Sequence, residues 1–242
     1  MVNLPVILTP LLLWEQQSFT KLVVEFIMKF RENLSQKYMA VELKERLSKE
    51  GLIIGVVGPT GVGKSTISKV LGEKLEISVI EENFPKNPFL ERFYENPKRW
   101  SYDSQNWFFL EKIKQLSNVN FNQSQIIDPA IEMDFIYAKT LHQIDFMETR
   151  EFKQYKTTFN VIYDNLLEKK GIRKPDAFLV VNASCDVLEQ RIRKRGRPFE
   201  LIMLEKYPSY LENLKRNVED FSCSNGIFVD ACDDSYINEI QL

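Results

Sequence analysis

A chain of 242 residues with 27% charged and 44% hydrophobic residues is long enough to bury one large core. Its formal net charge of −2 lacks the basic excess of a nucleic-acid binder, and its single histidine, His142, argues against Ser-His-Asp hydrolases, His-ligated zinc enzymes and a His general base. Three cysteines without metal-like spacing indicate reduced thiols, and therefore a cytoplasmic protein: Cys185, Cys223 and Cys232.

Residues 1–50 form a predicted N-terminal helical extension. An apolar stripe at helical spacing is made by Phe19, Leu22, Val23, Phe26, Ile27 and Phe30. A second helical run covers about 36–49 and ends before Gly51, a typical C-cap. The stripe favours packing on the main domain or on a second subunit, with a membrane-surface helix as the alternative. The apolar run 4–14 is too short to span a bilayer and lacks signal-peptide features, so we expect no membrane partner.

Residues 51–242 are predicted to form one domain in which strands alternate with helices. Short apolar runs bounded by turn residues predict five strands, at 52–57, 77–80, 125–128, 177–182 and 226–230. Apolar residues at spacings of three and four predict one long helix over 152–166. This alternation predicts a doubly wound α/β fold with a five-stranded parallel sheet.

A phosphate-binding loop follows the first predicted strand. Residues 58–65, GPTGVGKS, satisfy the pattern G-x-x-x-x-G-K-[ST] and precede a helical pattern. Glycines let backbone N–H groups turn toward phosphate oxygens, Lys64 would reach the β- and γ-phosphates, and Ser65 would hold Mg²⁺. The predicted nucleotide-binding residues of this loop are Gly58, Thr60, Gly61, Val62, Gly63, Lys64, Ser65 and Thr66. The guanine signature N-K-x-D and an acidic strand end typical of mechanical ATPases are both absent from the sequence.

The second predicted strand ends near Glu82, at the sheet edge where α/β proteins bind ligands, although a solvated strand end is the simpler alternative. The residues that follow it are Asn87-Pro-Phe-Leu90, Phe93-Tyr94, Pro97-Lys-Arg-Trp-Ser101 and Gln105. In this register the stretch resembles the deoxynucleoside kinase family, especially its bacterial branch, over about residues 52–234. The resemblance implies a P-loop nucleoside kinase fold and transfer of a phosphoryl group from ATP, with Mg²⁺, to the 5′-hydroxyl of a deoxynucleoside. It also implies a homodimer, whose contact the helix over 152–166 could supply.

The resemblance also implies roles for the matched positions on the acceptor side. Glu82 would be the general base for the 5′-hydroxyl, as a carboxylate suits the loose transition state of phosphoryl transfer. The residues implied for the sugar 3′-hydroxyl are Tyr94 and Glu200. Those implied for the base are Gln105, Asp134 and Lys112, the last replacing a family arginine. Asp128 takes the family's metal-binding position.

Residues 191–200, RIRKRGRPFE, resemble the family's lid, which closes over ATP. Arg191 and Arg195 lie four apart, on one helical face, and would neutralise charge on the moving phosphoryl group. A solvated helix end or a nucleic-acid patch is the alternative interpretation. The family's adenine-contacting turn falls on Asp230, Cys232 and Asp233.

The third predicted strand departs from the family at Pro129, where the family has an arginine beside the general base. Proline carries neither charge nor N–H, and loss of such a cation typically costs about 10² to 10³ in rate. Either Arg195, Arg197 or Lys112 covers for it, or the chain is a catalytically weakened nucleotide-binding subunit that acts through partners. A kinase of another small acceptor, such as a nucleoside monophosphate, is a further alternative.

Overall fold

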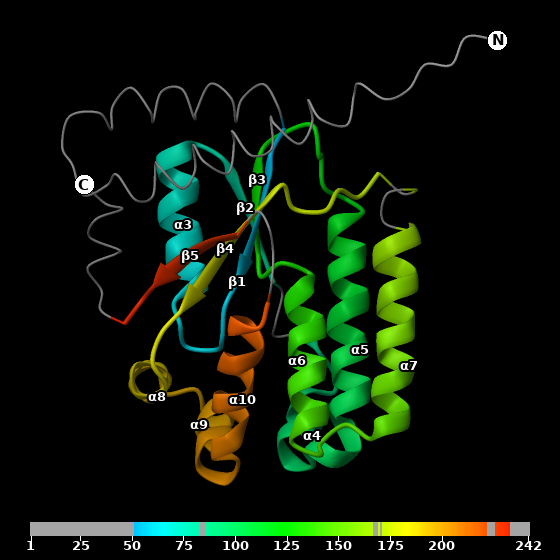
Figure 1. Ribbon diagram of the computed structural model, residues 1–242, viewed down its shortest axis with the longest axis vertical. Coiled ribbons are helices and arrows are strands. Elements are labelled where there is room, and N and C mark those ends of the chain that lie inside the picture. Colours follow the sequence, from blue (N-terminus) through cyan, green and yellow to red (C-terminus); the bar gives the residue numbers. More distant parts are fainter. Residues whose placement is uncertain (1–50, 83–85, 167–168, 170, 222–225, 233–242) are drawn as a thin grey trace.

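The computed structural model describes residues 51–82, 86–166, 169, 171–221 and 226–232 (Figure 1). The predicted helical extension over 1–50, Cys223 and Asp233 lie outside the described residues. Within these ranges, no helix is both long enough and apolar enough to cross a membrane.

A five-stranded, all-parallel sheet forms the centre of the domain, with strand order β2-β3-β1-β4-β5. The strands are β1 (Ile53–Val57), β2 (Ser78–Glu81), β3 (Gln125–Asp128), β4 (Ala177–Asn182) and β5 (Gly226–Asp230). The predicted fold class is therefore confirmed. β3, β4 and β5 have the predicted bounds, while the bounds of β1 and β2 differ from them by one residue.

Helices cover both faces of the sheet (Figure 1). They are α3 (Lys64–Leu75), α4 (Leu90–Glu95), α5 (Pro97–Leu116), α6 (Glu132–Gln143), α7 (Thr149–Val161), α8 (Cys185–Arg195), α9 (Pro198–Lys206) and α10 (Pro208–Glu219). α3 lies on one side of the sheet, and α5, α6 and α7 lie together on the other. The helix predicted over 152–166 is regular only to Val161, after which Ile162–Leu166 form a π-helical turn.

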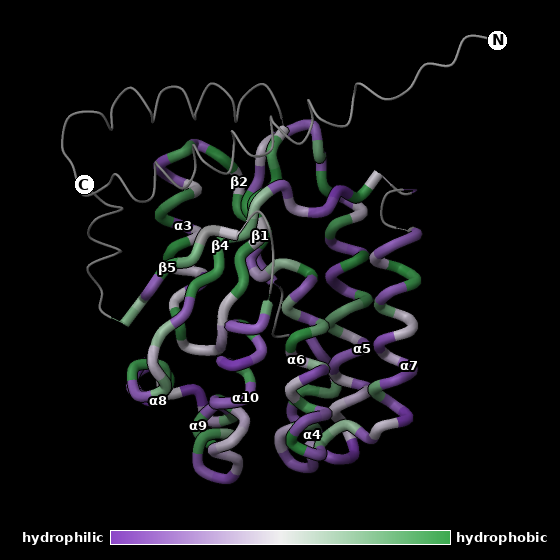
Figure 2. Tube along the Cα trace, viewed as in Figure 1, coloured by the Kyte–Doolittle hydropathy of each residue, from purple (hydrophilic) through white to green (hydrophobic). Residues whose placement is uncertain are grey.

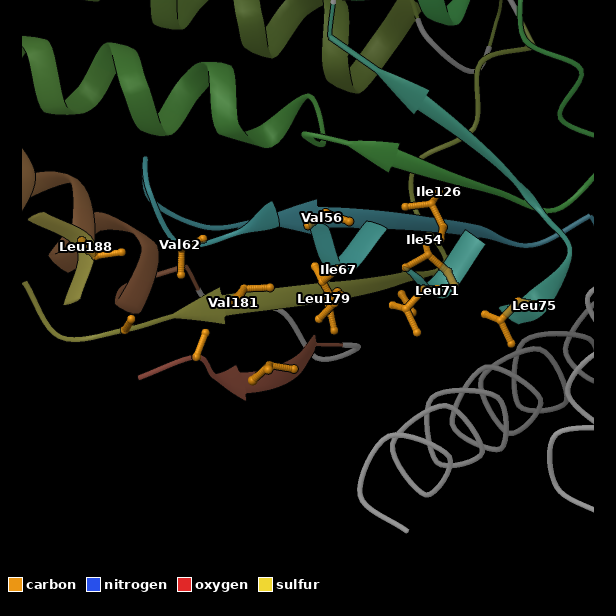
Figure 3. Close-up of a cluster of buried hydrophobic side chains, with 14 of the residues drawn as sticks. Ile54, Val56, Val62, Ile67, Leu71, Leu75, Ile126, Leu179, Val181 and Leu188 are labelled. Carbon is orange, nitrogen blue, oxygen red and sulfur yellow. The ribbon is translucent and has the colours of Figure 1, made fainter. Parts of the chain in front are cut away.

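The strands are apolar on both sides because both sides are covered. Ile54 and Val56 point toward Ile67 and Leu71 of α3 (Figure 3), whereas Ile53 packs with residues of the α5–α6–α7 layer. Figure 2 shows apolar residues concentrated along the strands and polar residues interspersed along the helices. Each fully buried Ile or Leu contributes about 1.5–3 kcal/mol relative to exposure, so this double covering fixes the sheet.

Several residues of the stretch after Glu82 are structural, since they hold the start of α5. Asn87 is buried, donates to Ser104 Oγ at 2.9 Å and accepts from the Phe89 backbone N–H at 2.9 Å. Asn96 accepts from the Arg99 N–H at the first turn, where Pro97 needs no hydrogen-bond acceptor. These hydrogen bonds fix the N-terminal part of α5.

Candidate functional site

A cavity of about 510 Å³ lies at the carboxyl edge of the sheet, a size ordinary for a small-molecule site. Residues far apart in the sequence meet in it, from the phosphate loop, β2, β3, α4, α5, α6 and the segment after α8. The predicted site residues that line it are Thr60, Gly61, Gly63, Lys64, Ser65, Thr66, Glu82, Tyr94, Gln105, Asp128, Asp134, Arg195 and Glu200.

The phosphate loop is shaped by its glycines and by its contact with α8. Gly61 and Gly63 have φ of +86° and +98°, in the left-handed region that favours glycine. A Cβ on Gly61 would lie 2.8 Å from Ile192 Cγ1, so the loop packs tightly against α8. Val62 buries its side chain in the core, and its carbonyl accepts from Arg191 Nη1 at 3.3 Å. Arg191 thus contacts the loop's backbone instead of lining the cavity.

Lys64 folds back over its own loop. Its Nζ donates to the carbonyls of Gly58 and Pro59, at 2.8 and 3.0 Å. Burial lowers the pKa of Lys64, while the negative charges of Asp128 and Glu82 oppose that shift. The charges of these two carboxylates therefore act on the ammonium, although neither forms an ion pair with it among the described residues. The ammonium lies at the start of the α3 helix, where an incoming phosphate can exchange with the two carbonyls.

Asp128 and Ser65 have the chemistry of a magnesium site. Asp128 is 2% exposed, and neither of its carboxylate oxygens accepts a hydrogen bond from the described residues. Such a buried, unpaired carboxylate is costly unless a cation joins it. Among the described residues, no group of three or more His, Cys, Asp and Glu side chains could hold a metal. The pair fits Mg²⁺, which commonly takes one or two protein oxygens together with water and phosphate oxygens.

Glu82 lies where β2 and β3 end. Its backbone N–H donates to the Asp128 carbonyl at 3.1 Å, and its side chain is 27% exposed to the cavity. Lys112 of α5 approaches from behind, with Nζ 3.9 Å from Glu82 Oε1. The same amine donates to the Pro129 carbonyl at 2.9 Å, and its side chain is only 1% exposed. Lys112, predicted to help read the base, is therefore placed beside Glu82 and does not line the cavity.

The far end of the cavity is acidic and buried. Gln105 Nε2 donates to the Asp134 carbonyl at 3.3 Å, and Oδ2 of Asp134 has no hydrogen-bond partner among the described residues. Burial raises the pKa of Asp134, and the charge of Glu82 adds to the rise. Glu132 lies nearby and accepts from the Tyr163 hydroxyl; burial raises the pKa of Glu132 as well. This end of the cavity offers amide and carboxyl groups to a ligand.

An ion pair joins two residues of the predicted lid segment, Arg195 and Glu200. α8 ends at Gly196, which has a φ of +69°, and Arg195 then makes two hydrogen bonds to Glu200, at 2.9 and 2.7 Å. Arg195, predicted to contact ATP, and Glu200, predicted to contact the deoxynucleoside, therefore bind each other. Phe199, between them, stacks on Tyr94 with ring centroids 4.6 Å apart.

Asp230 and Cys232, predicted to contact adenine, are exposed and do not line the cavity. Asp230 accepts from the Cys232 N–H at 3.0 Å, and Cys232 Sγ accepts from the Ser184 N–H at 3.2 Å. Their turn therefore lies against the start of α8.

Five aromatic residues that line the cavity were not predicted as site residues: Phe93, Phe108, Tyr137, Phe199 and Tyr210. Phe199 could have been found, because it lies inside the lid pattern. Tyr137 follows Asp134 by three residues and so shares its helix face. The sequence carries no comparable signal for Tyr210.

Known proteins of one family are similar to this chain in sequence and in fold. Residues 54–235 match the family described as Deoxynucleoside kinase. Deoxyguanosine kinase of Bacillus subtilis (strain 168) is 31% identical over 166 residues, which is 69% of this chain and 76% of that protein. A structure of deoxyadenosine kinase from M. mycoides, with dCMP and a flexible dCDP bound, superposes with a TM-score of 0.64 at 27% identity. That match covers 78% of this chain and 96% of the other. A mitochondrial protein of Bos taurus, NADH dehydrogenase [ubiquinone] 1 alpha subcomplex subunit 10, is 22% identical over 195 residues, 70% of this chain and 55% of that protein.

Proposed function

Because the chain belongs to the deoxynucleoside kinase family, we propose that it transfers the γ-phosphoryl group of ATP to the 5′-hydroxyl of a deoxynucleoside. The observation that carries this proposal is a continuous cavity that joins the phosphate loop, Glu82 and the polar end formed by Gln105 and Asp134. A triphosphate at one end and a nucleoside at the other would place the reacting atoms beside Glu82.

On the donor side, ATP would replace the loop's own carbonyls as the partner of Lys64. The ammonium, which now donates to Gly58 and Pro59, would turn to the β- and γ-phosphate oxygens. Ser65 and Asp128 would hold Mg²⁺, which supplies charge neutralisation on the phosphates when bound. Arg191 and Arg195 would add positive charge from the lid.

On the acceptor side, the 5′-oxygen would form a bond to the γ-phosphorus while the bond to the ADP oxygen breaks. Glu82 would accept the hydroxyl proton. Tyr94 and Glu200 would bind the 3′-hydroxyl, and burial raises the pKa of Tyr94, which keeps its phenol protonated as a donor. Gln105 and Asp134 would bind the base.

The proposal includes a cytoplasmic homodimer. Val161 of α7 and Leu110 of α5 are large apolar side chains that stay exposed, on two helices that pack together. A second copy would cover them. Light scattering on the purified chain would measure its mass, and a Val161→Glu variant that remains dimeric would move the contact elsewhere.

The first experiment is to incubate the chain with Mg-ATP and each of the four deoxynucleosides, with Lys64→Ala as the blank. We expect phosphorylation of one or two of them and none in the blank. Deoxynucleoside monophosphates, tested in parallel, would be poor acceptors. Preferential phosphorylation of a monophosphate would instead establish a kinase for that acceptor class.

A second function, a nucleotide-binding subunit with weak or no catalysis, is favoured by two observations. Pro129 removes a cation that the resemblance places beside the general base, and one relative is named as a subunit of a respiratory enzyme. This function predicts ATP binding without turnover. Isothermal titration with ATP, on a preparation that phosphorylates no deoxynucleoside, would distinguish it.

A further inference from the structure

The carboxylate of Glu82 takes part in one ion pair among the described residues, while the charge of Lys64 acts on it without such a contact. Lys112 Nζ lies 3.9 Å from Glu82 Oε1, and no other ion pair to Glu82 is found in that part of the chain. The lid arginines considered from the sequence face elsewhere: Arg195 and Arg197 both approach Glu200. Lys112 is therefore the cation that the fold delivers to the general base.

Lys112 is held firmly by the ends of two strands. Its amine donates to the Pro129 carbonyl at 2.9 Å, so it is bound to the residue that replaces the family's arginine. One turn further along α5, Gln115 Nε2 donates to the Glu81 carbonyl at 2.6 Å. These two hydrogen bonds fix α5 to the carboxyl ends of β2 and β3, where Glu81 is paired with Asp128. The position of the ammonium follows from this framework, independently of any ligand.

Burial gives this ammonium a strong influence. With 1% of its side chain exposed, Lys112 has little water around it, and a charge in such a site acts on its neighbours with little screening. Glu82, in contrast, is open to the cavity. Lys112 is therefore fixed behind the cavity, whereas Glu82 faces into it. In this arrangement the buried lysine can orient the carboxylate that would contact the substrate.

We propose that Lys112 is the positioning residue that substitutes for the arginine missing at Pro129, holding the Glu82 carboxylate oriented toward the 5′-hydroxyl. The proposal rests on the proposed function. It also distinguishes two roles for Lys112, because a residue that reads the base changes nucleoside binding, whereas one that acts through Glu82 changes the chemical step.

The test compares Lys112→Met with a control, Lys139→Met. The control removes an ammonium of α6 that lies 3.6 Å from Asp220, the residue after α10. We expect Lys112→Met to lower kcat about 100-fold, with KM values for ATP and deoxynucleoside within about threefold. Lys139→Met should leave kcat and both KM values unchanged.

Rescue provides a second measurement. Adding Pro129→Arg to Lys112→Met places a new cation near Glu82 from the end of β3. We expect the double variant to have a kcat at least tenfold higher than that of Lys112→Met. Pro129→Arg in the wild-type background should give no gain, since Lys112 already occupies that role. A raised deoxynucleoside KM with unchanged kcat in Lys112→Met would overturn the proposal and assign Lys112 to recognition of the base.

Failure of the proposed function is distinguishable from failure of this inference. If the wild-type chain phosphorylates no deoxynucleoside, the proposed function fails, and crystal structures of wild type and Lys112→Met decide the positioning role. A Glu82 side chain that leaves its wild-type orientation in the variant supports it. An unmoved Glu82 overturns it. Melting temperatures of both variants check folding, which methionine should preserve because it replaces a buried charge with a side chain of similar volume.

Discussion

The two ends of the cavity are constructed from different parts of the chain. The proposed donor end is largely backbone, a glycine loop whose carbonyls accept hydrogen bonds from Lys64. The proposed acceptor end consists of side chains from separate helices, Tyr94 of α4, Gln105 of α5 and Asp134 of α6, and Asp134 retains a buried oxygen that has no hydrogen-bond partner in the described part of the chain. A backbone cradle tolerates few changes but accepts any phosphate. A side-chain pocket can be altered one residue at a time, so acceptor specificity can diverge while the donor end stays constant.

The largest expected effect is at the donor end. Lys64→Ala should lower kcat about 10³-fold, because the loop would lose the cation that is proposed to contact the β- and γ-phosphates. The melting temperature should hold or rise, since burial, which lowers the pKa of Lys64, disfavours its charged form. Initial rates and thermal melts measure both. Activity within tenfold of wild type would contradict the assigned role of the loop.

At the junction of the two ends, Glu82→Gln should lower kcat about 10² to 10³-fold by removing the proton acceptor. Glu81→Gln is its matched control, as Glu81 is adjacent in sequence, 49% exposed and paired with Lys69 at 3.3 Å. We expect the control to stay within twofold in kcat and KM. Equal losses in both variants would indicate a general disturbance of β2.

The lid pair connects the two ends, and its loss should have an intermediate effect. Glu200→Gln removes a carboxylate that is 10% exposed and bidentate to Arg195, and should raise the deoxynucleoside KM about tenfold while changing the ATP KM less. Glu189→Gln, which breaks the exposed ion pair with Arg193, should change neither. A larger effect of Glu200→Gln on ATP than on deoxynucleoside would assign Glu200 to the donor end.

The smallest effect is on stability at the acceptor end. Burial raises the pKa of Asp134 above its unfolded value near 4, so the folded chain retains this proton longer, and stability falls as the pH rises through that interval. Asp134→Asn removes the titration. Its melting temperature relative to wild type should therefore increase from pH 5 to pH 8, by a few degrees. A difference independent of pH would show that Asp134 is ionised throughout.

Features that depend on a short continuous segment of the chain could be predicted from the sequence. The five strands were predicted from short apolar runs, and the glycine loop from about ten neighbouring residues, whereas closure of residues 191–200 over ATP stays a prediction. The fold follows because parallel strands covered on both faces are continuously apolar, and the glycine pattern is a local property of one loop.

Features that depend on the mutual position of elements could not be predicted. The direction of Lys112 is set by where α5 crosses the ends of β2 and β3, and the sequence pattern alone left both the base and the general base as partners. The Arg195–Glu200 ion pair depends on how the chain turns at Gly196. The role of Asp230 and Cys232 at adenine stays a prediction, since their turn lies beside α8 and outside the cavity.

The strand order has a consequence for how the protein is made. β1 is synthesised before any other strand of the sheet, yet its two neighbours come much later: Ile53 pairs with Gln125, and Ile54 with Ala177. The loop after β1 then packs against Ile192, later still in the chain. A nascent chain that has not yet released α8 from the ribosome cannot complete the packing of this loop, so nucleotide binding would be one of the last properties to appear during synthesis.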